Sequence, residues 1–267
     1  MTMTAPTSLL DVEHLRVAYG NHVAASDVAL HVSPGETVGL LGPNGAGKST
    51  VIHAIIGLVS PQTGRVLVCG EPNTSAPAKR AFGFAPDDLP TPLSLTGAET
   101  IALMARLRRG DFDNDFALWL AEHFELGPHL GRAVVGYSHG MRRKLQIVCA
   151  VSHHPALLIL DEPLRGLDPE AAAILHAILE VHTRSGGGVL LATHDLEAAA
   201  RTCDRVTIMA SGAVVGAGTP DEVCAQAGTL SLEPAFLALS GLSERVDDRR
   251  TAIVEKMSTQ YRCEEVI

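Results

Sequence analysis

The part of the chain that most constrains its fold is a glycine-rich stretch of nine residues, Gly42, Pro43, Asn44, Gly45, Ala46, Gly47, Lys48, Ser49 and Thr50. The apolar residues 38–41 before it favour a buried strand, and residues 51–56 after it favour a helix. A strand, a glycine-rich loop and a helix in this order form the context that a phosphate-binding loop requires. The glycines let several backbone N–H groups point at one anion, and the positive end of the helix adds to their attraction.

Four residues are predicted to bind the phosphates, bind a metal ion or activate the attacking water. Lys48 can reach the β- and γ-phosphates of a nucleotide, and Ser49 can ligate Mg²⁺. A second apolar run, residues 157–160, ends in Asp161 and Glu162. Because the carboxyl ends of parallel strands line a ligand crevice, we expect Asp161 to hold Mg²⁺ and Glu162 to polarise the attacking water.

The pattern of apolar runs predicts an α/β fold with a parallel-sheet core. Runs without strict alternation are separated by helices, which indicates a sheet covered on both faces. Residues 10–17 and 23–32 suit a small antiparallel sheet, and residues 206–215 suit a hairpin. Three successive helical patterns predict an inserted helical subdomain over about residues 87–154. Residues 71–79 are expected to be an exposed loop and residues 80–85 a strand, with a weakly ordered tail or partner-contacting helix from residue 246.

The net charge limits the class of partner, and the cysteine content indicates the redox setting of the protein. The net charge of −9 argues against a nucleic-acid partner. The basic clusters at residues 142–144 and 249–250 are interpreted as a solvated helix face and a polar tail. The odd number of widely spaced cysteines, 5 in all, fits a reduced, cytosolic setting. With no apolar run of about 18 residues, any spanning part must come from another chain.

Three further residues each admit two interpretations. Tyr19 could stack on adenine or be an ordinary half-buried turn tyrosine. His194 follows another buried strand, so it could contact the γ-phosphate or be a capping histidine. Ser138 is expected to cap a helix whose N–H groups form an anion site, or simply to start a plain helix. By spacing, Ser138 lies away from its own phosphate loop and could therefore meet the nucleotide of a second copy.

Taken in order, these motifs resemble the ATP-binding subunit of an ABC transporter over about residues 10–241. The resemblance is carried by Tyr19, the glycine-rich loop, and the runs at 137–141, 161–163, 166–168 and 193–194. It implies one ABC-type domain over residues 1–241 and a C-terminal tail over residues 242–267. It also implies that Tyr19 stacks on adenine, that Glu162 is the catalytic base and that His194 senses the γ-phosphate.

The resemblance further implies a site shared between two subunits. Ser138 and Gly140 would close over ATP bound to the facing subunit, and Asp168 would line the dimer interface. The Tyr-Ser-x-Gly-Met form of residues 137–141 resembles the branch that serves drug, lipid or polysaccharide exporters. The family usually has glutamine after Pro86, whereas this chain has Asp87. Asp87 could reach Mg²⁺ through water but would repel phosphate without the metal.

The function that these features imply is an ATP-hydrolysing motor using ATP and Mg²⁺. Two copies, or one copy and a similar partner, would sandwich two ATP molecules. Closure of the two subunits would be transmitted, near residues 87–95, to membrane-spanning permease subunits. The motor would be a peripheral protein on the cytoplasmic face of the membrane. One alternative is a soluble clamp acting on nucleic acid or ribosomes, although such proteins usually have two cassettes or basic extensions. A phosphate-loop kinase is another, although it would not need Ser138 or Asp168.

Overall fold

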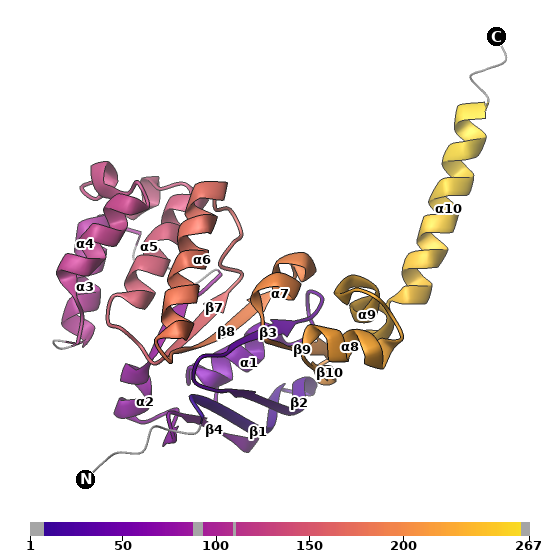
Figure 1. Cartoon of the computed structure of the whole chain (residues 1–267), viewed down its shortest axis with the longest axis horizontal. Helices are drawn as coiled ribbons and strands as arrows, with labels where there is room; N and C mark the ends of the chain where they lie inside the picture. Colours follow the sequence, from indigo (N-terminus) through magenta and orange to yellow (C-terminus); the bar gives the residue numbers. More distant parts are fainter. Residues whose placement is uncertain (1–7, 88–92, 109–110, 263–267) are drawn as a thin grey trace.

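A computed structural model describes residues 8–87, 93–108 and 111–262 of the chain (Figure 1). The predicted antiparallel sheet is confirmed. It contains β1 (Leu10–Tyr19), β2 (His22–Val32), β4 (Thr63–Val68) and β5 (Glu71–Pro72), in the order β2-β1-β4-β5. The first two strands pair antiparallel along most of their length, as their partly alternating patterns predict.

The central sheet has the order β10-β9-β3-β8-β7-β6. Its strands are β3 (Thr37–Leu41), β6 (Phe82–Ala85), β7 (Leu157–Asp161), β8 (Gly188–Thr193), β9 (Arg205–Ala210) and β10 (Ala213–Gly218). All neighbours pair parallel except β9 and β10, which form the predicted hairpin. Since the strands are parallel, the loops that follow β3, β7 and β8 begin at one edge of the sheet.

Both faces of the central sheet are buried, as predicted. Side chains alternate between the faces along a strand. Leu158 and Leu160 of β7 belong to a core cluster shared with the helices on one side, whereas Leu157 and Ile159 belong to a cluster shared with the antiparallel sheet and α1 (Lys48–Ile55). Figure 1 shows helices gathered on one side of the central sheet and the antiparallel sheet on the other.

The described residues between β6 and β7 contain three α-helices, which confirms the helical pattern expected there. They are α3 (Gly97–Arg108), α4 (Asn114–His123) and α5 (His139–Val151). Thr96 and Glu99 exchange hydrogen bonds at 2.8 and 3.1 Å in the predicted capping box. Asp113 and Ser138 cap the next two helices. The division of the chain into domains and a tail stays a prediction.

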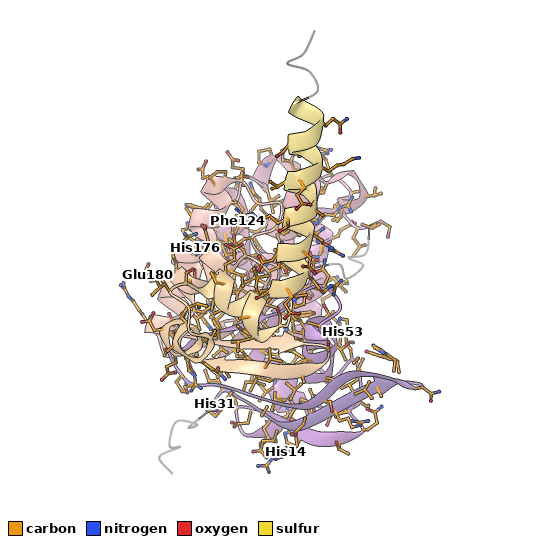
Figure 2. All side chains as sticks on the ribbon, turned by 90° about the vertical axis from the view of Figure 1, so that its right-hand side faces the viewer. His14, His31, His53, Phe124, His176 and Glu180 are labelled. Carbon is orange, nitrogen blue, oxygen red and sulfur yellow. The ribbon has the colours of Figure 1, made fainter. Side chains whose placement is uncertain are left out.

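After β7 the helices are α6 (Pro169–Arg184), α7 (Leu196–Thr202), α8 (Pro220–Ala227), α9 (Leu232–Leu239) and α10 (Ser243–Arg262). Asp168 caps α6 and Pro169 is its first residue, as predicted. Of the two alternatives predicted from residue 246, the helix is confirmed for the described residues, because α10 is a helix of 20 residues. Its contact with a partner stays a prediction. Figure 1 shows α10 extending away from the body of the chain, and in Figure 2 the C-terminal end of the helix projects beyond the rest of the molecule.

Two local predictions are wrong. Residues 71–79 are not an irregular loop, because they contain β5 and most of α2 (Ala76–Ala81), and the next strand begins at Phe82. Ser75 caps α2 and Pro77 lies in its first turn, so the polar, proline-rich composition marks a helix start. The cluster at residues 142–144 is not a solvated face either, because Arg143 is 1% and Lys144 8% exposed.

None of the helices in the described ranges is both long enough and apolar enough to cross a bilayer. Cys69, Cys149, Cys203 and Cys224 are free thiols. Cys263 lies outside the described residues.

His153, two residues after the end of α5, is a buried histidine whose surroundings disfavour its protonated form. Its Nε2 donates a hydrogen bond to the carbonyl oxygen of Phe82 at 3.1 Å, and its side chain is 6% exposed. Nδ1 is buried and has no partner among the described residues, so protonation would leave an unpaired N–H group. Burial, reinforced by the nearby Arg108 guanidinium, lowers the pKa of His153 to about 4.

We expect His153 to make the folded chain sensitive to acid. The unfolded chain binds a proton at this ring below the ordinary pKa of 6.5, whereas the folded chain does not until about 4. Stability is therefore lost as the pH falls through this window, by about 2 kcal/mol between pH 7 and pH 5. Urea unfolding at both pH values should show a smaller loss in His153→Gln, which keeps a donor but does not titrate. Equal losses in both proteins would contradict this assignment.

Candidate active site

The glycine-rich loop joins β3 to α1 and has the conformation that its sequence predicts. Gly45 and Gly47 have φ angles of 82° and 102°, in the left-handed region that favours glycine. A Cβ atom on Gly47 would lie 2.2 Å from the carbonyl oxygen of Ala24, and one on Gly42 would lie 2.6 Å from that of Met209. No side chain in the described ranges caps the start of α1, so its first N–H groups are available to an anion.

A cavity of about 370 Å³ opens beside this loop, at the C-terminal edge of the central sheet. Among the described residues, its walls are formed by Asn44, Lys48, Ser49, Asp87, Asp161, Glu162, Arg165 and His194. Residues predicted separately from three strand ends thus meet in one place. A larger apolar groove of about 780 Å³ between α4 and α6 contains none of the predicted site residues.

Lys48 lies folded over the loop that precedes it. Its Nζ atom donates to the carbonyl oxygen of Gly42 at 2.6 Å and to that of Pro43 at 3.3 Å. Burial lowers the pKa of Lys48, and the Glu162 and Asp161 carboxylates oppose this shift. The ammonium group is therefore held at the wall of the cavity by weak neutral acceptors, which a phosphate oxygen could replace with a stronger, charged one.

Asp161 and Ser49 have the chemistry of a magnesium site. Burial, together with the neighbouring Asp87 and Glu162 carboxylates, raises the pKa of Asp161 to about 6. A divalent cation would relieve this crowding of negative charge. The described residues hold no group of three His, Cys, Asp or Glu side chains suited to a metal. Mg²⁺ usually binds through one or two protein carboxylates together with substrate phosphates.

Glu162 is held in an unusual backbone conformation at the end of β7. Its φ angle is 49°, which is uncommon for a residue with a side chain. Its carboxylate accepts hydrogen bonds from Nδ1 of His194 at 2.8 Å and from the Thr193 hydroxyl at 3.3 Å. The Glu162 side chain is 13% exposed, whereas that of His194 is 65% exposed. The ends of β7 and β8 thus fix the carboxylate while leaving the imidazole accessible.

Asp87 is bound by two arginines that the sequence does not predict as site residues. Its Oδ1 accepts a hydrogen bond from Arg143 at 2.7 Å, and its Oδ2 accepts one from Arg165 at 2.9 Å. The expected repulsion between Asp87 and phosphate is therefore reduced by two positive charges. Arg143 belongs to the basic cluster interpreted above as a solvated face, and no pattern in the sequence distinguishes Arg165.

Six residues of the glycine-rich loop do not line the cavity: Gly42, Pro43, Gly45, Ala46, Gly47 and Thr50. Outside that loop, four predicted residues, all of them described, also lie away from its walls: Tyr19, Ser138, Gly140 and Asp168. Tyr19 ends β1 and is 50% exposed. Ser138 is exposed at the start of α5, where its hydroxyl accepts a hydrogen bond from the Met141 N–H at 3.2 Å. Within the described part of the chain, these residues do not reach the cavity of the same copy.

The start of α5 packs tightly against the loop between β7 and α6. A Cβ atom on Gly140 would lie 2.6 Å from the carbonyl oxygen of Gly166. The Asp168 carboxylate accepts the Ala171 N–H as a helix cap and pairs with Lys144 at 2.8 Å. The absence of a side chain on Gly140 thus permits this close approach, and Asp168 links the loop to α5.

A family model described as ABC transporter matches residues 25–165. The chain belongs to the ABC transporter family. Its relatives include Nod factor export ATP-binding protein I of Cupriavidus metallidurans, 33% identical over 91% of this chain and 84% of the relative. Lipopolysaccharide export system ATP-binding protein LptB of Haemophilus influenzae is 32% identical over 81% of this chain and 92% of the relative. Linearmycin resistance ATP-binding protein LnrL of Bacillus subtilis is 31% identical over 88% of this chain and 76% of the relative.

Solved structures of the ABC transporter family share the fold. An ATP-binding subunit of an ABC transporter, 34% identical, superposes with a TM-score of 0.81 over 87% of this chain and all of that one. A nucleotide-free cassette that is 22% identical superposes with a TM-score of 0.66. Family membership makes this chain an ATP-binding subunit of the ABC ATPases, which hydrolyse ATP to power transport and work with membrane permease subunits.

Proposed function

We propose that this chain is the motor subunit of an exporter and that two subunits enclose two ATP molecules between them. The observation that carries the proposal is the single cavity in which Lys48, Ser49, Asp161, Glu162 and His194 meet. The export function of the relatives named above supports the direction of transport, as does the Tyr-Ser-x-Gly-Met form of residues 137–141.

The phosphates bind between the glycine-rich loop and Lys48. Backbone N–H groups of residues 42–50 surround the β-phosphate, and the Lys48 ammonium contacts the β- and γ-phosphates. Ser49 and Asp161 hold Mg²⁺, which when bound neutralises part of the phosphate charge. Tyr19, exposed at the end of β1, stacks on the adenine ring.

Glu162 is the general base of hydrolysis. Its carboxylate lies in the wall of the cavity and is oriented by hydrogen bonds from His194 and Thr193. A carboxylate held in this way can accept a proton from the water that attacks the γ-phosphate. His194 is largely exposed and can turn an N–H group toward the γ-phosphate, so it reports whether that phosphate is present.

The second subunit supplies the lid of each site. Ser138 and Gly140 are exposed or partly exposed at the N-terminus of α5, a helix of 13 residues, and they do not line the cavity of their own chain. We place them over the ATP of the facing subunit, where the helix N-terminus attracts phosphate. Asp168, tied to α5 through Lys144, lies along the same interface. The facing subunit is either a second copy or a similar chain.

The motor works at the cytoplasmic face of the membrane through separate permease subunits. The expected contact near residues 87–95 lies partly outside the described residues. The net charge of −9 supports the absence of a nucleic-acid partner.

Two measurements distinguish this function from a clamp on nucleic acid. We expect the chain to hydrolyse ATP without stimulation by DNA or RNA, and to co-purify from membranes with a membrane-spanning protein. Stimulation by nucleic acid that falls steeply with salt would favour the clamp instead.

A further inference from the structure

The Asp87 carboxylate connects three parts of the chain through ion pairs with two arginines. Asp87 follows β6, Arg143 belongs to α5, and Arg165 lies in the loop between β7 and α6. Arg143 also donates to the backbone carbonyl oxygens of Pro86 and, at 3.3 Å, of Asp161. Both carboxylate oxygens of Asp87 thus have a positively charged partner, at 2.7 and 2.9 Å.

The charges around the cavity explain why such partners are needed. Among the described residues, its walls hold the carboxylates of Asp87, Asp161 and Glu162, and the cations of Lys48 and Arg165. Without Arg165, the walls would hold three carboxylates and a single lysine, and Asp87 would keep only Arg143 as a positively charged partner. Repulsion between charges a few ångströms apart is strong in a partly buried cavity, because little water screens it there.

We propose that Arg165 is a positioning residue of the nucleotide site. Together with Arg143, it neutralises the charge of the Asp87 carboxylate and holds that carboxylate toward the two arginines. A glutamine at this position, as the family usually has, is neutral and needs no such partner. An aspartate at this position needs positively charged partners if the cavity is to bind phosphate. The inference rests on the proposed function only in that the ligand is ATP.

Arg165 is the better residue for a test. Its side chain is 57% exposed, so truncation removes a charge without opening a hole in the core. The Arg143 side chain is 1% exposed, and its loss would also disturb the packing of α5. Thermal unfolding of each variant checks that the fold is kept.

The experiment is a double-mutant cycle on ATP affinity. We expect Arg165→Ala to weaken ATP binding about tenfold in the wild-type background, because the Asp87 charge is then only half compensated. In an Asp87→Gln background the same substitution should change the affinity less than about twofold, since no acid remains to be held. The loss in the wild-type background should be larger in EDTA than with Mg²⁺, because the metal adds positive charge. Arg184→Ala removes an exposed arginine paired with Glu180 at 2.7 Å on α6 and serves as the matched control.

Two outcomes would overturn the inference. An equal loss in both backgrounds would mean that Arg165 acts without Asp87, for example by touching the phosphates itself. No loss in either background would mean that Arg165 does not serve the site. Because the measured quantity is ATP affinity, a chain that binds ATP but powers no transport would contradict the proposed function and leave the result of the cycle intact.

Discussion

Replacing Glu162 by glutamine is expected to lower kcat for ATP hydrolysis by about 10²- to 10⁴-fold while ATP still binds. The amide has nearly the shape of the carboxylate and can still accept the hydrogen bond from His194, observed at 2.8 Å. It cannot accept a proton from water, so only the chemical step is lost. Steady-state hydrolysis and equilibrium ATP binding, measured on the same preparation, separate these two effects.

The variant should also accumulate as an ATP-bound dimer, because in the proposed function hydrolysis is the step that lets the two subunits part. Light scattering with and without ATP measures this. Glu180→Gln, on the surface of α6 and paired with Arg184, is the matched control and should hydrolyse ATP normally. Hydrolysis by Glu162→Gln at the wild-type rate would contradict the assignment of the base.

Replacing Lys48 by alanine is expected to weaken ATP binding by about 10²- to 10³-fold, because two charge-assisted hydrogen bonds to phosphate are lost. In the structure the ammonium lies 2.6 Å from the Gly42 carbonyl oxygen, at the wall of the cavity. No other lysine lines that cavity among the described residues. Calorimetric titration with ATP and Mg²⁺ measures the loss.

Lys79→Ala, an exposed lysine on α2, controls for the general effect of removing a positive charge. It should bind ATP as the wild type does. Retention of full affinity by Lys48→Ala would contradict the assignment of the phosphate site.

Much of the sheet and the phosphate site could be predicted from the sequence because both depend on local patterns. A buried parallel strand is a continuous apolar run, and the polar residues that follow it must lie at one edge of the sheet. The positions of Asp161, Glu162 and His194 directly after such runs are enough to predict that they lie together. The conformation of the glycine-rich loop could also be predicted from its sequence, because its positive φ angles strongly favour glycine.

Contacts between distant parts of the chain could not be predicted in this way. Arg143 and Arg165 lie 56 and 78 residues from Asp87 in sequence, and no local pattern links them. A run of basic residues suggests exposure, yet Arg143 is buried, because it pairs with the partly buried Asp87 carboxylate and donates to the backbone carbonyl oxygens of Pro86 and Asp161. The helix α2 has only 6 residues, too few for a periodic apolar face.

The shared site can be tested most directly by mixing two inactive variants, Lys48→Ala and Ser138→Asp. Aspartate still caps α5 but puts a negative charge where the phosphates of the facing subunit are proposed to lie. If the two halves of a site come from different subunits, each mixed dimer holds one intact site. An equal mixture should then recover roughly a quarter of the wild-type rate, because half of the dimers are mixed. A mixture as inactive as its components at every ratio would contradict the shared site.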